Sequence, residues 1–95
     1  MSSLDDWSEE IEKCWASQTT FIYPTGQMTI EFRTYLFEHN FGINYVKRLL
    51  KLSNKENRAI MLQTVEVFAD ETRRKSLNNT YNKLLKIKSE IEGWK

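Results

Sequence analysis

Apolar residues recur at intervals of three and four positions near the start of the chain. They form a stripe made of Leu4, Trp7, Ile11, Cys14 and Trp15. This spacing places the apolar side chains along one face of an α-helix. Asp5 and Asp6 fall in the first turn, where the helix dipole favours negative charge. The pattern therefore predicts a helix over residues 4–17.

The pattern is less regular between residues 18 and 42. Pro24 and Gly26 interrupt it, and both residue types favour turns, so we expect an irregular segment at about 18–28. A helix over 29–40 follows, with Thr29 placed to cap its start and Gly42 placed to close its end. Alternating apolar residues also fit a hairpin of 19–23 with 28–34. The helix is favoured because no further strand is evident to complete a sheet.

Helical spacing returns in the rest of the chain and predicts helices over 43–52, 54–74 and 77–93. Ser53 and Glu56 have the spacing of a capping box, which would begin the second of these helices. The apolar stripe shifts phase near 73–79, so the chain bends there or begins a new helix. Together these elements predict an all-α fold: a single helical domain over 1–95, built as a small bundle of four to five short helices.

Charge divides the chain into an acidic and a basic part. Residues 1–42 have a formal charge of −5, and residues 43–95 have one of +6. The last predicted helix carries an apolar seam of Leu77, Leu84, Ile87, Ile91 and Trp94. We expect this seam to pack against the acidic helix 4–17 of the same chain, which slightly favours a monomer. Pairing of two such seams between chains would instead give a homodimer.

The chain lacks the residue pattern of a catalytic or metal site. His39 is the only histidine, and Cys14 is the only cysteine and lies on the apolar stripe. Metal sites need several such ligands at short spacing. We therefore predict no enzymatic activity, no catalytic residues, no metal and no cofactor. No apolar run approaches the length of a membrane span, and acidic residues stand where a basic leader would begin. We expect a soluble, cytoplasmic protein that makes no membrane contact.

Aromatic residues are concentrated in the middle of the chain. Phe37 and Tyr35 flank Leu36, so on a helix or a strand they do not all point the same way. An exposed ring in this stretch would suit a protein–protein contact. We therefore predict a non-enzymatic protein interaction module, a small adaptor, inhibitor or regulatory subunit acting on a larger protein. The proposed protein-binding residues are Tyr35, Phe37, Phe41 and Tyr45.

The alternative function is nucleic-acid binding through basic residues in 47–58 and 73–88. The candidate phosphate contacts are Lys47, Lys51, Lys55, Arg58, Arg73, Arg74 and Lys75. Cationic side chains that meet phosphates supply most non-specific affinity for nucleic acids. Against this reading, the isoelectric point is near 7.8, and acidic residues interrupt the same helices. A dedicated nucleic-acid-binding domain is usually far more basic.

Two short patterns in these segments have specific meanings. The stretch around Gly42 resembles a helix-turn-helix in rhythm, but Glu38 and Arg48 stand where that motif needs a small and an apolar residue. An ordinary helix–loop–helix corner is therefore favoured. The run Arg73-Arg74-Lys75-Ser76 has the form of a basophilic phosphorylation motif.

Overall fold

The computed structural model describes the backbone of residues 3–20 and 25–94, and the side chains of residues 9–20 and 29–94. Within these ranges the chain forms helices and no strand. The helices are α1 (Ser3–Ser17), α2 (Thr25–Glu38), α3 (Ile43–Leu52), α4 (Lys55–Arg74) and α5 (Asn78–Gly93). The predicted all-α bundle is confirmed. The alternative hairpin is wrong, because residues 28–34 lie inside α2; residues 21–23 of its first strand fall outside the described ranges.

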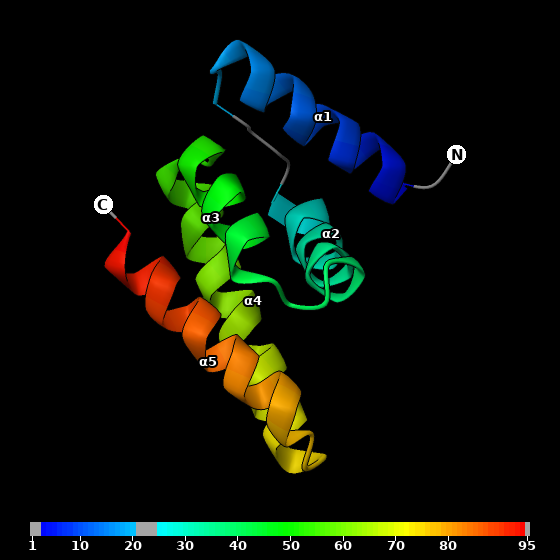
Figure 1. The fold of residues 1–95 in the computed structure, drawn as a ribbon, viewed down its shortest axis with the longest axis vertical. Coiled ribbons are helices and arrows are strands. Elements are labelled where there is room, and N and C mark those ends of the chain that lie inside the picture. The colour runs from blue at the N-terminus through cyan, green and yellow to red at the C-terminus, as the bar shows by residue number, and fades with distance from the viewer. Residues whose placement is uncertain (1–2, 21–24, 95) are drawn as a thin grey trace.

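Contacts between pairs of helices define the packing (Figure 1). α4 and α5 lie side by side, α2 crosses α4, and α3 packs against α5. α1 lies at one end of the molecule, against α2 and α3. The centre is filled by fully buried apolar side chains, namely Phe32, Leu36, Val46, Leu49, Leu50, Met61, Val65, Leu84 and Ile87.

The predicted start of α2 is wrong by four residues, since the helix begins at Thr25 and not at residue 29. The sequence offers a physical reason. A proline directly before a helix removes an N–H group that would have no intrahelical acceptor there. Gly26 lies in the first turn, and a single helical glycine costs only about 1 kcal/mol relative to alanine. Proline and glycine are therefore compatible with a helix start here, although both also favour turns.

The turn between α2 and α3 does not use Gly42 as predicted. Asn40 and Phe41 adopt the left-handed conformation, with φ of 50° and 57°, whereas Gly42 has a φ of −72° and precedes the first turn of α3. The Phe41 amide donates to the Leu36 carbonyl at 2.7 Å, which closes α2 as in a Schellman motif. Positive φ is unfavourable for a bulky residue, and burial of the Phe41 ring offsets this cost.

The predicted capping box at Ser53 is also wrong, because Asn54 caps α4. The Asn54 side chain accepts a hydrogen bond from the Asn57 amide at 2.8 Å. Ser53 instead ends α3, where its hydroxyl donates to the Leu49 carbonyl at 2.7 Å. Asparagine and serine are about equally good N-cap residues. Because Ser53 and Asn54 are adjacent, the sequence leaves the start of α4 ambiguous by one position.

The break between α4 and α5 is confirmed. The chain turns at Ser76, which has a φ of 59°, and the Leu77 amide donates to the Thr72 carbonyl at 2.9 Å. This turn folds α5 back along α4, so the two helices cannot share one straight apolar face.

The predicted pairing of the C-terminal seam with the first helix is wrong. α5 packs against α4 and α3, whereas α1 packs against α2 and α3. Leu84, Ile87 and Ile91 of the seam are buried, and Leu77 is half exposed. The apolar stripe of α5 matched α1 in length, but α4 directly precedes α5 in the same helical hairpin and covers its stripe. The expected monomer stays a prediction.

Candidate functional site

The four aromatic residues proposed for protein binding fall into two pairs. Tyr35 and Phe41 are buried, with 3% and 8% of their surface exposed, whereas Phe37 and Tyr45 are 74% and 43% exposed. The edge of Phe37 approaches Phe41, with ring centroids 6.5 Å apart, and Tyr35 lies 6.4 Å from Tyr45. Each pair therefore combines an exposed ring with a buried one that supports it.

Tyr35 and Tyr45 enclose His39. The His39 and Tyr45 rings stack at 3.8 Å, and Tyr35 meets His39 edge-on at 4.5 Å. The Tyr35 hydroxyl donates to the Tyr45 carbonyl at 3.3 Å. Burial raises the pKa of Tyr35 to about 12, although the nearby Arg48 guanidinium acts in the opposite direction. These rings contact one another and so stabilise the α2–α3 corner. Beside them lies a small cavity of about 90 Å³, which Ile11 and Glu12 of α1 also line.

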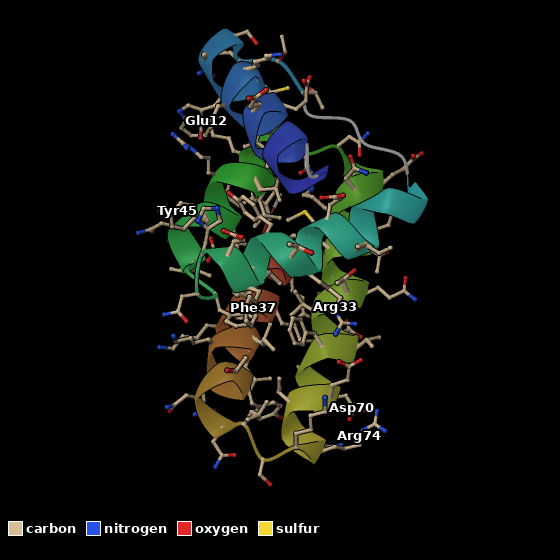
Figure 2. All side chains as sticks on the ribbon, turned by 90° about the vertical axis from the view of Figure 1, so that its right-hand side faces the viewer. Glu12, Arg33, Phe37, Tyr45, Asp70 and Arg74 are labelled. Atoms are coloured by element: carbon tan, nitrogen blue, oxygen red, sulfur yellow. The ribbon has the colours of Figure 1, made fainter. Side chains whose placement is uncertain are left out.

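Phe37 belongs to a second arrangement, on the solvent side of α2. Ile30, Arg33 and Phe37 follow one another at intervals of three and four residues, so they share one face of the helix; we call it the α2 outer face. Ile30 is 68% exposed. Figure 2 shows Arg33 and Phe37 along the same side of α2, with Arg33 above α4 and Phe37 above α5. Two large apolar side chains thus flank a cation in contact with solvent.

The α2 outer face is held in place from below. Arg33 Nη2 lies 2.8 Å from Glu71 Oε2 of α4, and its guanidinium lies 4.6 Å from the centre of the Phe68 ring. Phe68 in turn meets Phe41 at 5.5 Å, and Phe41 supports Phe37. Arg33 and Phe37 are therefore both connected to α4 through aromatic contacts, which restricts their motion before any partner binds.

A groove runs beside the α2 outer face. It has a volume of about 210 Å³ and is lined by Thr29, Arg33, Gln63, Thr64 and Val67. Val67 is 51% exposed. Among the residues whose side chains are described, six large apolar residues are exposed, and Ile30, Phe37 and Val67 are three of them. Val67 lines the groove together with Arg33, and Ile30 and Phe37 lie on either side of Arg33 on the α2 outer face.

Sequence reasoning missed Ile30 and Val67. Ile30 belongs to the alternating pattern of residues 28–34, and only the helical conformation of this segment turns its side chain to solvent. Val67 lies off the buried stripe of α4 and follows the charged residue Glu66. The sequence signal for Val67 was its position off the apolar stripe of its own helix, which predicts an exposed apolar side chain.

The candidate nucleic-acid residues do not form one surface. Arg58 and Arg73 are separated by roughly 22 Å along the axis of α4. Arg73 and Arg74 pair with Asp70 at 3.0 and 2.6 Å; the Arg74 charge, followed by the hydrogen bond from Arg73, lowers the pKa of Asp70. The guanidinium of Arg58 donates to the Ser53 carbonyl at 2.6 Å. These three arginines thus already have acceptors.

The remaining basic candidates lie on α3 and near its junction with α4. Lys51 lies 5.3 Å from the centre of the Trp15 ring, on the same ring that Arg48 approaches to 4.7 Å. Arg48 also pairs with Glu12 at 2.5 Å. Arg48 and Lys51 of α3 therefore contact α1. Lys47, Lys55 and Lys75 are exposed and belong to different segments of the chain.

The corner around Gly42 has the packing of an ordinary helix–loop–helix. Glu38 is exposed, and Arg48 is engaged with α1. Val46 and Leu49 supply the buried contacts of α3 instead. The packing residues that a helix-turn-helix needs at the positions of Glu38 and Arg48 are therefore missing from this corner.

No reactive cluster is apparent in the described part of the chain. Cys14 is buried, with its thiol 4.0 Å from the Thr20 carbonyl. Within the side chains that are described, no group of three histidine, cysteine or acidic residues is close enough to hold a metal ion. None of the helices, as far as they are described, is long and apolar enough to cross a membrane.

Comparison with protein-family models, curated proteins and solved structures gave no significant match.

Proposed function

We propose that this chain is a non-enzymatic protein-binding module, a small adaptor, inhibitor or regulatory subunit, whose α2 outer face and Val67 contact a larger protein. The observation that supports this most directly is Phe37, a phenylalanine that is 74% exposed on α2. Grouped exposed apolar side chains are typical of interaction sites. Large aromatic residues and arginine are the types that contribute most to binding energy.

The contacts that hold Arg33 and Phe37 in place also favour a binding role. Binding costs free energy when flexible side chains must be immobilised, by about 0.5–1.5 kcal/mol each. Arg33 is already held by Glu71 and Phe68, and Phe37 rests against Phe41. A partner would therefore meet side chains that are largely ordered in advance.

Substitution on the surface tests the proposal. Phe37→Ser removes the exposed ring, and Leu85→Ser is the matched control, because Leu85 is an exposed apolar residue of α5 outside this groove. A partner would first be identified by co-purification from the native host, and its affinity for each variant measured by calorimetry. Loss of one central aromatic anchor costs 2 kcal/mol or more, so we expect Phe37→Ser to weaken binding by about 30-fold or more. We expect Leu85→Ser to bind like the unmodified chain.

The same experiment separates the proposal from nucleic-acid binding. An apolar interface changes little with salt, whereas contacts to several phosphates lose affinity steeply between roughly 50 and 200 mM salt. Equal affinities of the Phe37→Ser and Leu85→Ser variants would contradict the proposal. Binding of an oligonucleotide with a steep salt dependence and without any effect of Phe37→Ser would favour the alternative.

A further inference from the structure

The turn between α4 and α5 carries a serine that the protein-binding surface does not use. Ser76 is exposed, lies outside both helices and has a φ of 59°. Its hydroxyl has no hydrogen-bond partner among the described residues. Arg73, Arg74 and Lys75 directly precede it and are also exposed. An accessible hydroxyl thus follows three consecutive cations.

Positive charge around this turn exceeds the available negative charge. Arg73 and Arg74 both bind the single carboxylate of Asp70, and Lys75 has no ion-pair partner among the described residues. The side chains of Arg73 and Arg74 remain 67% and 70% exposed. They are accessible to an enzyme that reads basic residues, and they are close enough in sequence to meet a new negative charge on Ser76.

The start of α5 also lacks a negative group. Leu77 occupies the N-cap and offers no side-chain hydrogen bond, and the first turn contains no acidic residue. Within the helix, the Tyr81 amide is the first that reaches a backbone acceptor, the Leu77 carbonyl at 2.9 Å. The preceding N–H groups, at the positive end of the helix dipole, receive no acceptor from the cap.

We propose that Ser76 is a phosphorylation site for a serine kinase that recognises preceding basic residues, and that its phosphate stabilises the α4–α5 turn. The Ser76 hydroxyl oxygen attacks the γ-phosphorus of ATP, and the bond from that phosphorus to ADP breaks. The hydroxyl proton is transferred to the kinase. The product carries a phosphate between the arginine-rich end of α4 and the start of α5.

The added charge acts locally. A phosphoserine has a charge of roughly −1.5 to −2 at neutral pH and accepts strong hydrogen bonds from arginine and from helix N-termini. Arg73 and Arg74, which share the carboxylate of Asp70, then have two anionic groups to bind, Asp70 and the phosphate. The start of α5 also gains a nearby anion. Both effects favour the folded turn. The last turn of α4 must open while the kinase acts, and helix ends open most readily.

Phosphorylation of the folded full chain tests the site. The chain is incubated with Mg·ATP and cyclic-AMP-dependent protein kinase, and intact mass and peptide mapping are measured. We expect one phosphoryl group on Ser76 and none at this position in Ser76→Ala or Ser76→Gly. The glycine variant is included because glycine tolerates the positive φ of this residue. Ser89→Ala is the control, because Ser89 is an exposed serine of α5 preceded by one lysine. No incorporation into the folded chain, or equal incorporation into Ser76→Ala, would overturn the site.

Thermal unfolding tests the consequence. At low salt we expect the melting temperature of the phosphorylated chain to rise by about 4 °C or more, and the gain to shrink at about 1 M salt as the charges are screened. Ser76→Ala taken through the same incubation shows any effect that does not come from the phosphate. An unchanged or lower melting temperature after full modification of Ser76 would overturn the stabilising role.

Discussion

The attachment of α1 to α3 provides a sharp test of the packing. Arg48 connects the two helices, because it pairs with Glu12 and lies 4.7 Å from the centre of the Trp15 ring. The ion pair is partly exposed, with 33% and 61% of the two side chains accessible, so it contributes about 0.2–1 kcal/mol. The cation–π contact contributes about 0.5–1 kcal/mol. We therefore expect Arg48→Gln to lower the free energy of unfolding by about 1–2 kcal/mol.

The neighbouring residue supplies the control. Lys47 is exposed on the same helix and has no ion-pair partner among the described residues, so Lys47→Gln should change stability by less than about 0.5 kcal/mol. Urea unfolding followed by circular dichroism measures both variants. A double-mutant cycle with Glu12→Gln isolates the ion pair, and its coupling energy should decrease at high salt. Equal stabilities of Arg48→Gln and Lys47→Gln, with no coupling to Glu12, would refute this placement of α1.

Three further predictions concern single residues. Leu84 is fully buried and Leu77 half exposed, so Leu84→Ala should lower the free energy of unfolding by about 2–5 kcal/mol in urea titrations and Leu77→Ala by about 1 kcal/mol or less. Ser76→Gly should raise the melting temperature, because glycine tolerates the positive φ that serine adopts there; a lower value would contradict the turn geometry. The pKa of Tyr35 is raised to about 12 in the fold, so the unfolded chain loses this proton first, near pH 10. Up to about 3 kcal/mol of stability is then lost between pH 10 and 12, and Tyr35→Phe should flatten this part of the unfolding profile.

Helix content was predictable, because apolar spacing reports on local structure. The phase shift near 73–79 separated α4 from α5, and the stripe through Ile11 and Cys14 located α1. Helix ends were less predictable, because they depend on which of several adjacent residues takes the cap. Ser53 and Asn54 are both good cap residues, and only the folded chain assigns that role to Asn54.

Helix partners were not predictable, because an apolar stripe does not specify which other stripe covers it. α4 and α1 both offered apolar faces to α5, and the buried face of α4 was obscured by polar positions such as Thr64 and Thr72. The charge of each helix did not identify its packing partner either. The acidic character of α1 suggested attraction to the basic last helix, whereas its described cationic contacts come from Arg48 and Lys51 of α3.

The candidate site was predictable only in part. Adjacent residues of a helix cannot all face the core, so an exposed ring near Leu36 was predictable, and Phe37 is that ring. The grouping with Ile30, Arg33 and Val67 depends on how α2 crosses α4. That crossing brings residues more than 30 positions apart in the chain to one groove, so no local pattern contains it.

Photo-cross-linking in the native host tests the protein-binding role most directly. A photoreactive phenylalanine analogue replaces Phe37 in one version of the chain and Leu85 in another, and adducts are identified by mass spectrometry. We expect irradiation to join position 37 to one defined protein, and position 85 to give no such adduct. Adducts of equal yield at both positions, or adducts formed only with nucleic acid, would contradict a protein-binding surface on α2.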